Sequence, residues 1–558
     1  MKRIFGAFLV VFLMHSACPA LAEEQVQKTI PPSTAAEQGA PPAQSAPAPE
    51  KTSATSRPNE LPGPDPTGSG TGMASDLIGP GTGAITAGEI RKSEAGEPLA
   101  VKLADEVGHN RIAMNFIWTL ICAYLVFLMQ AGFAMVETGF TRSKNAGHTV
   151  AMNMMIFVFS VLGYWALGYG LQTGGAGPNP LGGGTALLDG EFALRLFGRP
   201  FGLFGTKGFF LAGQSYDVSI LALFMFQAVF MDIAATIPTG AMAERWTLKS
   251  FVVYGFFISM FVYPLYANWV WGRGWLSQLG SNFGLGHGVV DFAGSSVVHM
   301  VGGVSGLAGA IILGPRMGKF RSNGAPNAIP GHHIPMAVVG CLVLSFGWLA
   351  FNSGSTLAGG DLRISVIAVN TILAAAASCF SATCYMWIFY GKPDLSLAAN
   401  GLLGGLVAIS AACAFVSPSG AVIIGLAAGV LCCASVFFIE RRLKVDDPVG
   451  AISVHGICGA WGLVGLGLFA DGTYGDGLNG VTGPVRGLFY GSASQFTAEI
   501  IGVAVNFIFI FASMYAFFKV LDRIIPLRVS EEVEFEGLDQ NEVSVTAYTD
   551  FGNTKTRR

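Results

Sequence analysis

Two histidines occupy equivalent places in two similar stretches of this chain. The stretches read Asp291-Phe-Ala-Gly-Ser-Ser-Val-Val-His299 and Asp447-Pro-Val-Gly-Ala-Ile-Ser-Val-His455, so each histidine follows an aspartate by eight residues. Both stretches open long apolar segments. A neutral imidazole there offers one hydrogen-bond donor and one acceptor, which suits a narrow path for a small polar molecule. A single histidine could instead be a packing residue, but two at matching positions favour a functional pair.

Aromatic side chains and a hydroxyl form a second candidate cluster. Phe226 and Phe230 are four residues apart, as are Phe351 and Ser355, and Trp271 ends another apolar segment. In helices that run in opposite directions, this spacing puts Phe226, Trp271 and Ser355 at one level and the other two phenylalanines one turn deeper. Aromatic faces with a hydroxyl can bind a small cation. The alternative is ordinary packing, because phenylalanine and interfacial tryptophan are common in membrane helices.

The elements that hold these residues are predicted to be membrane helices. Of 558 residues, 52% are apolar and 12% are charged, and the mean hydropathy is +0.53. These values predict an all-α integral membrane protein. A net charge of -3 without a basic face argues against nucleic-acid partners. The cysteines beyond the N-terminal segment lie in apolar runs without zinc or disulfide spacing, so no metal or cofactor is predicted.

Eleven apolar segments are long enough to cross about 30 Å of hydrocarbon. The predicted spans are Met114–Val136, Val150–Leu171, Val218–Met242, Phe251–Trp271, Phe292–Leu313, Met336–Thr356, Ile364–Tyr390, Leu397–Ser417, Ala421–Ile439, Ala451–Phe469 and Phe496–Leu521. The loops after odd-numbered spans carry most of the Lys and Arg residues, as at Arg142, Arg245, Arg316 and Arg441. By the positive-inside rule we predict an inner-membrane protein with its mature N-terminus outside and its C-terminus in the cytoplasm.

Spans one to five and six to ten are predicted to form an inverted-topology repeat, followed by a final helix. Asp, Gly, Val, His and Gly recur at equal spacing around the two histidines, ending at Gly303 and Gly459. An odd number of spans per copy inserts the second copy upside down. Each histidine then lies about 12 Å from its aspartate, measured from opposite faces, so both approach the midplane. We interpret Asp447 as a helix cap and Asp291 as a cap that also supports the outer site.

The chain divides into four predicted regions. Residues 1–22 have Lys2 and Arg3, an apolar run and a small-residue ending, as a cleavable signal peptide does. Residues 23–110 are rich in Pro and Ala and are predicted to be a disordered extracytoplasmic arm. Residues 111–523 form the membrane domain, and residues 524–558 form a cytoplasmic tail with acidic residues from Glu531 to Asp539.

The residues singled out above lie in stretches that resemble the ammonium transporter family, bacterial members included, to which the yeast Mep and animal Rhesus proteins also belong. The similar stretches are Gly132-Phe-Ala-Met-Val-Glu137-Thr-Gly-Phe with Lys144-Asn145, Gly240-Ala-Met-Ala-Glu244-Arg245, Asp291-Phe-Ala-Gly, Gly347-Trp-Leu-Ala-Phe351-Asn352-Ser-Gly-Ser355 and Asp446-Asp447-Pro448 followed by His455-Gly456. Their order and spacing extend from the first span into the tail.

The resemblance implies an eleven-helix homotrimer with one pore per subunit. It implies that ammonium, or its analogue methylammonium, is recruited at Phe226, Trp271 and Ser355 and passes a gate of Phe230 and Phe351. His299 and His455 would then line a pore that ammonia crosses after ammonium has lost its proton. An apolar pore favours a small neutral molecule over a bare ion. The acidic tail resembles that of bacterial members, which implies regulation and a P-II signalling protein as partner.

Some features leave alternatives. Glu137-Thr-Gly139 replaces a Tyr-Gly-Gly turn, and Asn268-Trp-Val-Trp271 differs from the usual lead-in, so Trp269 competes with Trp271 for recruitment. The position before Gly272 favours Trp271. The alternative functions are an ammonium sensor that signals through its tail and a Rhesus-like gas channel, the latter disfavoured by a site suited to a cation. An enzyme is not expected, because the sequence shows no nucleophile, metal cluster or phosphate loop in a sizeable soluble region.

The tail is predicted to find opposite charges within the chain. The short basic loops Arg316–Arg321 and Arg441–Lys444 would lie on the same side of the membrane as the acidic tail. Surface ion pairs of this kind contribute about 0 to 1 kcal/mol each. A docked tail would therefore be displaceable.

Overall fold

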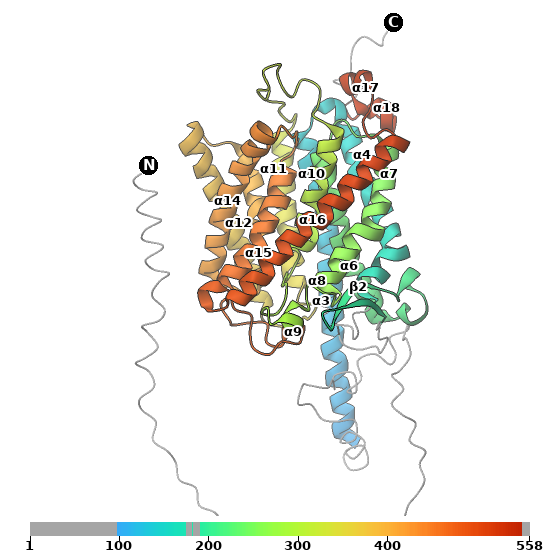
Figure 1. The fold of residues 1–558 in the computed structure, drawn as a ribbon, viewed down its shortest axis with the longest axis vertical. Coiled ribbons are helices and arrows are strands. Elements are labelled where there is room, and N and C mark those ends of the chain that lie inside the picture. Colours follow the sequence, from blue (N-terminus) through green and yellow to red (C-terminus); the bar gives the residue numbers. More distant parts are fainter. Residues whose placement is uncertain (1–97, 175–180, 182–189, 549–558) are drawn as a thin grey trace, which may run out of the picture. The chain divides into compact units, whose positions relative to one another are not determined.

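The computed structural model describes residues 98–174, 181 and 190–548. The predicted signal peptide and most of the predicted arm lie outside this part. Within it, long apolar helices run side by side (Figure 1), as expected of an all-α membrane protein. The helices and strands are α3 (Pro98–Phe140), α4 (Ala146–Gly163), α5 (Tyr169–Thr173), β1 (Glu191–Leu196), β2 (Arg199–Gly205), α6 (Val218–Ala241), α7 (Leu248–Phe257), α8 (Tyr263–Trp271), α9 (Leu279–Phe283), η7 (Ser295–Met300), α10 (Val301–Leu313), α11 (Ile334–Gly354), α12 (Ile364–Tyr390), α13 (Leu395–Ile409), α14 (Pro418–Phe438), η9 (Ile452–Ile457), α15 (Cys458–Phe469), α16 (Ala493–Ile524), α17 (Glu531–Glu536) and α18 (Leu538–Val543).

Several of these helices join into longer ones. The π-helical turn η3 (Tyr164–Gly168) links α4 to α5, η6 (Ile258–Val262) links α7 to α8, and η8 (Ile439–Leu443) extends α14. Counted in this way, the described part has ten helical stretches that are long and apolar enough to cross a bilayer. They correspond to ten of the eleven predicted spans.

The eighth predicted span, Leu397–Ser417, is built differently. Its helix α13 is apolar but has only 15 residues and ends at Ile409. At 1.5 Å per residue it is about 22 Å long, short of the roughly 30 Å of a bilayer core. The described part therefore has eleven apolar helices, ten of full length and one short.

The chain continues from α13 as a buried, non-helical segment, residues 410–416. Its carbonyl groups accept hydrogen bonds from other elements: the N–H of Ala293 bonds to Ser410, and the amide of Asn370 bonds to Cys413 and Val416. Irregular backbone is tolerated at membrane depth where protein surrounds it and satisfies its polar groups. Hydrogen bonds from neighbouring helices thus replace those that a longer helix would have made.

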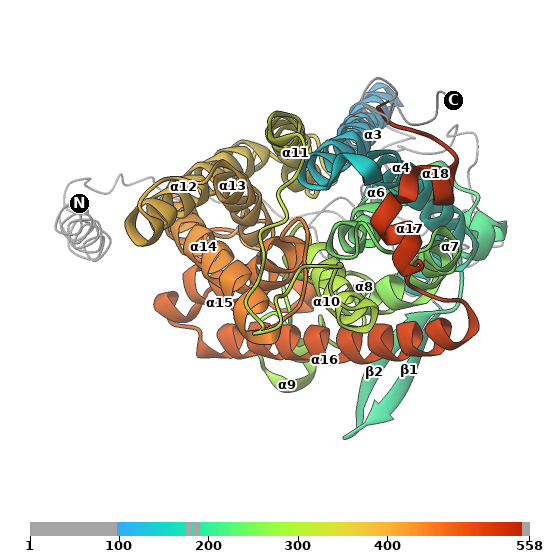
Figure 2. The same ribbon diagram turned by 90° about the horizontal axis from the view of Figure 1, so that it is seen from above.

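The bundle of helices has two distinct ends. One end carries α17 and α18 and the other carries the hairpin of β1 and β2 (Figure 1), and we call them the tail end and the hairpin end. Helix α3 packs along α11, and α12 packs along α13 and α14. Helix α16 lies obliquely across the others and contacts α10 and α15 (Figures 1 and 2).

Helix α3 begins earlier than predicted. It starts at Pro98 and projects beyond its neighbours at the hairpin end (Figure 1), so residues 98–110 are helical, although the predicted arm extends to Asn110. Leu99, Leu103 and Val107 recur every four residues on this extension and are exposed. Charged residues between them lower the local hydropathy, which explains the later predicted start.

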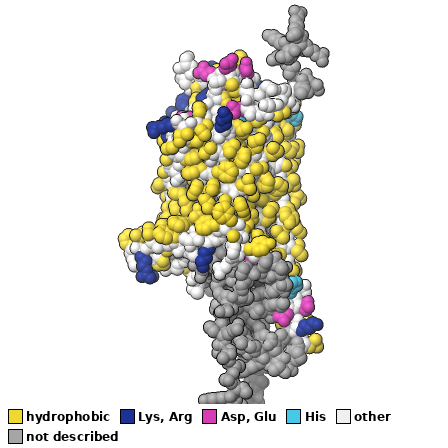
Figure 3. All heavy atoms as spheres, turned by 90° about the vertical axis from the view of Figure 1, so that its right-hand side faces the viewer, with side chains coloured by type: hydrophobic (Ala, Val, Ile, Leu, Met, Phe, Trp, Pro, Cys, Tyr) yellow, Lys and Arg dark blue, Asp and Glu magenta, His cyan; other side chains and the backbone are white. Residues whose placement is uncertain are grey.

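Exposed apolar side chains cover the middle of the molecule. On the face shown in Figure 3, a broad hydrophobic belt crosses the middle of the helices, with charged side chains gathered above and below it. Phe346, Phe380 and Ile508, on α11, α12 and α16, are examples of apolar helix residues that are more than half exposed. A soluble protein rarely exposes so large an apolar surface, whereas contact with lipid requires one.

The predicted repeat is present in the local structure of its two copies. The carboxylate of Asp291 accepts hydrogen bonds from four successive N–H groups, and that of Asp447 accepts three in the same arrangement. Gly294 and Gly450 both have left-handed φ, 111° and 79°, which favours glycine. Each is followed by a π-helical turn, η7 or η9, that carries the histidine.

The two copies run in opposite directions. Arg316 follows the end of α10, and its guanidinium bonds to Asp446, which precedes the start of η9. The end of one histidine-bearing helix therefore meets the beginning of the other. This is the geometry that an inverted repeat requires.

Candidate functional site

Glycines let the two histidine-bearing turns cross closely. A Cβ atom added at Gly303 would lie 2.2 Å from the nitrogen of Gly456, and one at Gly459 would lie 2.5 Å from the carbonyl oxygen of Ser295. No side chain fits at either distance, so the crossing requires glycine at both places. It brings His299 and His455 together, with their Nδ1 atoms 3.2 Å apart and their ring centroids 5.3 Å apart. Both rings are buried.

The hydrogen bond between the rings gives the neutral pair complementary tautomers. One Nδ1 must carry the proton and the other must accept it. The Nε2 atom of the donating ring is then an acceptor, and the Nε2 atom of the accepting ring is a donor. Nε2 of His299 has no partner among the described residues, and His455 lines a small cavity. The pair therefore presents at least one unused polar atom, Nε2 of His299, within a largely apolar environment.

Aromatic rings continue from the histidines toward the hairpin end. His299 lies 5.4 Å from Phe351, Phe351 stacks on Phe230 at 4.0 Å and 15°, and Phe230 lies 4.5 Å from Phe226, all measured between ring centroids. The three phenylalanines are at most 2% exposed. On the other side of the pair, Phe133 of α3 lies 5.9 Å from His455. We call this series, from Phe226 to His455, the ring column.

Trp271 meets the ring column from α8. Its ring lies edge-on to Phe230 at 6.2 Å, and its Nε1 donates a 2.6 Å hydrogen bond to the carbonyl oxygen of Asp291. Trp269 points elsewhere, toward Phe509 and the carbonyl of Leu203. The structure therefore places Trp271, and not Trp269, beside the predicted gate.

Asp291 connects the outer cluster to the first histidine turn. Its carboxylate caps η7, while its backbone carbonyl holds Trp271. Burial raises the pKa of Asp291, and hydrogen bonds from the backbone of Val297 and from Ser296 oppose that rise. Asp291 thus links Trp271, through its backbone carbonyl, to the first histidine turn, through its carboxylate.

Ser355 lies at the end of α11, one turn beyond Phe351. Its hydroxyl donates a 2.8 Å hydrogen bond to the carbonyl of Phe351. The preceding residue, Gly354, packs against the ring of Phe226, which a Cβ there would approach to 3.0 Å. The structure brings this helix end to the outer ring of the column, with the hydroxyl bonded within its own helix.

Trp348 is a neighbour of the pair that sequence reasoning did not single out. Its ring stacks on His299 at 4.7 Å and 19°, and its Nε1 donates to the hydroxyl of Ser410. Trp348 precedes Phe351 by three residues on α11, so both face the same neighbours. That spacing in the Gly347-Trp-Leu-Ala-Phe351 stretch was the available signal. Ser410 lies at the end of the shortened helix α13.

A buried carboxyl group was also missed. Glu137 and His455 line the same cavity of about 20 Å³, on the order of one water molecule. The carboxylate of Glu137 accepts hydrogen bonds from Thr239 at 2.7 and 2.9 Å and from Asn153 at 2.7 Å. It thereby joins α3 to α4 and α6. A lone acidic residue in an apolar segment was the signal in the sequence.

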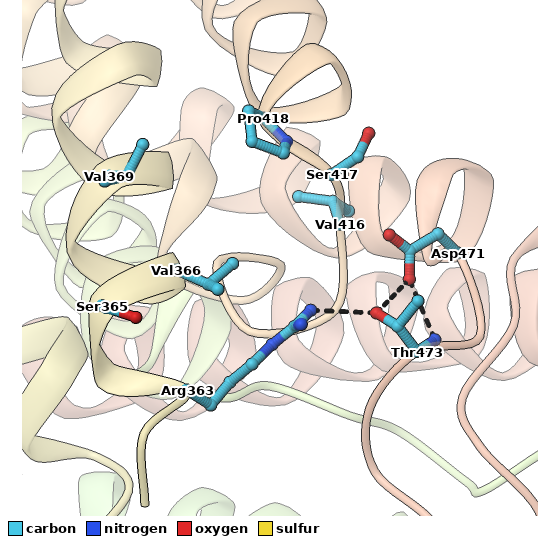
Figure 4. Close-up of a pocket in the computed structure, with 9 residues that line it drawn as sticks. All are labelled: Arg363, Ser365, Val366, Val369, Val416, Ser417, Pro418, Asp471 and Thr473. Carbon is cyan, nitrogen blue, oxygen red and sulfur yellow. Dashed lines mark hydrogen bonds between the residues drawn. The ribbon is translucent and has the colours of Figure 1, made fainter.

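A wider cavity of about 410 Å³ lies away from the ring column. It is lined by the starts of α12 and α14 and by the chain after α15, and it includes Arg363, Pro418 and Asp471 (Figure 4). The guanidinium of Arg363 bonds to Thr473 and to the carbonyl of Ala414. None of the residues predicted to handle the substrate lines this cavity.

Buried ion pairs close the tail end of the two repeats. Arg316, with a side chain 2% exposed, bonds to Glu244 and Asp446, whose side chains are fully buried. Burial disfavours the charge on Asp446, yet Arg245 and Arg316 hold its pKa below the usual range. Burial likewise disfavours the charge on Arg316, but Asp446 and Glu244 raise its pKa. Arg142 adds a further ion pair with Glu244.

The acidic side chains of the tail dock on this end mainly through backbone N–H groups, one of which belongs to Met317 in the predicted loop Arg316–Arg321. Asp539 accepts hydrogen bonds from the backbone of Gly147 and His148 at the start of α4, and Glu542 accepts one from Leu248 at the start of α7. Glu534 accepts hydrogen bonds from Arg528 and from the backbone of Met317, next to Arg316.

The second predicted basic loop makes other contacts. Its Lys444 bonds to the carbonyl of Gly324, and Arg441 lies over the ring of Phe437. No tail contact with this loop is found among the described residues. The prediction that Arg441–Lys444 attracts the tail is therefore not supported by the structure.

These features define a class of protein. Apolar helices in an inverted repeat, with a polar pair where the two copies cross, are the architecture of a multi-pass membrane transport protein. A sequence profile of the Ammonium Transporter Family matches residues 117–548. The chain belongs to the ammonium transporter family. Membership agrees with the prediction of a transport protein rather than an enzyme.

Alignments with individual relatives cover most of this chain and most of each relative. The chain is 44% identical to ammonium transporter Amt2 of Archaeoglobus fulgidus over 448 residues, which cover 80% of this chain and 90% of that protein. It is 34% identical to the ammonium transporter of Bacillus subtilis, over 78% of this chain and 98% of that protein.

Two solved structures are also similar. A protein titled Sensor Amt Protein has a TM-score of 0.68 and 33% identity and covers 78% of this chain and 99% of its own. Mep2 from Candida albicans has a TM-score of 0.63 and 25% identity and covers 75% of this chain and 87% of its own.

Proposed function

We propose that the chain transports ammonium by binding NH4+ at the hairpin end, removing its proton and conducting NH3 past the histidine pair. The observation that carries this proposal is the buried ring column, in which Nε2 of His299 is left without a described partner. A bare ion in such a path would lose its hydration without replacement. Ammonia is small and neutral, and the unused imidazole nitrogens can bond to it.

Recruitment takes place where the column meets the hairpin end. Trp271 and Phe226 offer aromatic faces to the cation, and Ser355 offers a hydroxyl oxygen. A desolvated cation–π contact contributes about 2 kcal/mol. Asp291 has a supporting role, because it orients Trp271 through its carbonyl and the first histidine turn through its carboxylate.

Phe230 and Phe351 act as the gate. Ring stacking at 4.0 Å is van der Waals contact, so no molecule passes between the rings in this conformation. Conduction requires at least one ring to rotate, a side-chain motion that is fast on the timescale of transport. Proton loss before this step keeps the charge out of the apolar pore. The released proton either remains at the entry side or crosses separately.

The tail end is proposed to face the cytoplasm. Arg142, Arg245, Arg316 and Lys319 gather there with the docked tail, as the positive-inside rule expects of cytoplasmic loops. The protein would then be a multi-pass inner-membrane protein with its mature N-terminus outside. The family resemblance supports a homotrimer with one pore in each subunit.

A second candidate function is ammonium sensing. The observation that favours it is the docked tail, together with the similarity to a solved structure titled Sensor Amt Protein. A sensor would pass little substrate, and ammonium binding would change the tail instead. A P-II signalling protein at the tail end would fit either function.

Uptake of labelled methylammonium separates these functions. The chain is expressed in cells that lack other ammonium transporters, and uptake is compared with that of a Phe351→Trp variant, whose larger ring obstructs the gate. Transport predicts saturable uptake that the variant loses. Parallel current measurements in proteoliposomes report the charge moved per molecule. Saturable binding without uptake would reject transport in favour of sensing.

A further inference from the structure

The hairpin at the hairpin end has one apolar face. Phe192 pairs with Phe204, Leu194 with Phe201, and Leu196 with Arg199 in the antiparallel register. Residues directly opposite each other in such a pair share a face. The opposite face carries Glu191, Ala193 and Arg195, paired with Gly205, Gly202 and Pro200. The hairpin is therefore amphipathic across its two faces.

Much of the apolar face is open. Phe192, Leu194 and Leu196 are each 43 to 44% exposed, and Phe197 at the turn is 89% exposed. Phe192 stacks on Phe204 at 4.8 Å, so the exposed rings are held in a fixed arrangement. An exposed row of large apolar side chains on a short hairpin is unfavourable in water, because isolated hairpins have little core of their own.

The turn of the hairpin carries an exposed phenylalanine in a strained backbone conformation. Phe197 and Gly198 form a two-residue turn with φ of 53° and 75°. Turns of this kind favour Asn-Gly, because a bulky side chain with positive φ is strained. Phenylalanine at this place is therefore poorly explained by turn geometry. It places the largest apolar ring at the most exposed point of the hairpin.

The second strand is fixed to Trp269, in the last turn of α8, and to Trp275, which follows that helix. The Nε1 of Trp269 bonds to the carbonyl of Leu203, and the N–H of Trp275 bonds to the carbonyl of Gly202. Phe201 stacks on Trp275 at 6.0 Å. Tryptophans at the ends of membrane helices mark the level of the lipid headgroups. The hairpin is thus attached at headgroup depth.

The views show where the free face lies. Seen from the tail end, the hairpin extends past α16 to the outside of the helices (Figure 2). In the side view, the hydrophobic belt continues onto the upper side of this projection, while Lys and Arg side chains lie on its lower side (Figure 3). The apolar face of the hairpin is thereby continuous with the belt that contacts lipid.

We propose that the hairpin is an interfacial membrane anchor whose apolar face, with Phe197 at its tip, inserts into the bilayer leaflet at the hairpin end. Arg195 and Arg199 are exposed beside the tip, and long basic side chains reach phospholipid phosphates while their stems remain in apolar surroundings. An apolar face with a basic border is the pattern of segments that lie in the interface plane. Contact with lipid explains three observations together: the apolar face continues the hydrophobic belt, the hairpin is attached at headgroup depth, and its tip carries a phenylalanine in a strained conformation.

Spin-label accessibility tests the anchor without measuring transport. Phe197→Cys is labelled with a nitroxide in the full-length protein, in nanodiscs of phosphatidylcholine with phosphatidylglycerol. The wild-type chain, taken through the same labelling, supplies the background from its own cysteines. Collision rates are measured with oxygen, which partitions into lipid, and with a nickel chelate, which remains in water. We expect the label at 197 to collide more with oxygen than with nickel.

Arg195→Cys is the matched control, because Arg195 lies on the face of β1 opposite to Phe192, Leu194 and Leu196. Its label should favour nickel. A label at 197 that favours nickel would place the tip in water and overturn the proposal. A label that neither reagent reaches would place protein on the apolar face and would overturn it equally. Because uptake is not measured, neither outcome depends on the proposed transport mechanism.

Discussion

The Nδ1 atoms of His299 and His455 lie 3.2 Å apart, so that one imidazole donates a hydrogen bond to the other although each comes from a different copy of the repeat. The hydrogen bond therefore requires a histidine from each copy of the repeat. The tautomers of the two residues are consequently coupled, because exchanging the proton between the Nδ1 atoms reverses which Nε2 is donor and which is acceptor. The pair is best regarded as a single polar element at the crossing of the repeats.

Replacing both histidines with alanine should abolish normal ammonium-selective conduction. The variant lacks the imidazole hydrogen bonds to a passing ammonia, each worth about 1 kcal/mol, which corresponds to roughly a tenfold or greater fall in selective flux. Uptake of labelled methylammonium, in competition with other monovalent cations, measures it. Either no flux or a wider, unselective leak agrees with the mechanism. Selective uptake at the wild-type rate would remove His299 and His455 from it.

Changing Trp271 to leucine together with Ser355 to alanine should weaken the capture of dilute ammonium. The loss of a cation–π face of about 2 kcal/mol raises the half-saturating concentration by roughly tenfold or more, with a smaller effect on flux at saturation. Trp269→Leu is the control, because that ring lies outside the column. An unchanged concentration dependence in the double variant would place recruitment elsewhere.

Glu137 allows a test of how much the hydrogen bonds beside the cavity that it shares with His455 contribute to stability. Glu137→Gln keeps an acceptor oxygen for Asn153 and should leave the thermal unfolding midpoint close to that of the wild type. Glu137→Leu leaves buried polar partners unpaired and should destabilise the protein by about 1 to 3 kcal/mol. Fluorescence-detected size-exclusion chromatography after heating measures both. Equal stability of the two variants would show that these hydrogen bonds contribute little.

The buried ion pairs at the tail end give a prediction with a pH dependence. Asp446→Asn leaves Arg316 beside Glu244 alone and should lower stability by about 3 to 5 kcal/mol. Because the folded-state pKa of Asp446 lies below the ordinary 3.8, its contribution is complete above that pH and is lost as the pH falls further. The wild type should therefore lose stability below about pH 4 more steeply than the variant. Parallel acid unfolding curves would refute the assignment.

The parts of this site that could be predicted from the sequence are those whose residues recur at regular intervals. The eight-residue interval from Asp291 to His299 recurs at His455, and helix periodicity is enough to place both at one depth. The aromatic column followed from intervals of four residues in helices of opposite direction. These inferences needed only the rise of a helix and the direction of each span.

Other parts depend on contacts that hydropathy does not report. The run from Leu397 to Ser417 is apolar throughout, but α13 ends within it because side chains such as Asn370 satisfy the following carbonyls. Trp348 stacks on His299 only because α11 and η7 meet at that level. The acidic side chains of the tail accept mainly from backbone N–H groups, which a pattern of oppositely charged side chains does not reveal.

The docked tail is expected to control uptake. Its acidic side chains make individually replaceable contacts: Asp539 caps the start of α4, Glu542 bonds at the start of α7, and Glu534 bonds to the backbone of Met317. Loss of one cap costs about 1 kcal/mol, so the docked and free states can interconvert and a partner can compete for the same contacts. We expect a chain truncated after Arg528 to assemble in the membrane but to take up methylammonium at an altered rate.

A milder change separates docking from the mere presence of the tail. Asp539→Ala removes both cap hydrogen bonds at α4 and should reproduce part of the effect of truncation. Glu532→Gln is the control, because that side chain is exposed and the structure assigns it no side-chain hydrogen bond among the described residues. Truncation should also abolish co-purification with a P-II signalling protein. If the truncated chain is made at normal levels, transports normally and still retains that partner, then the tail is not a regulatory element, and its buried Asp539 serves only to stabilise the end of the helix that it caps.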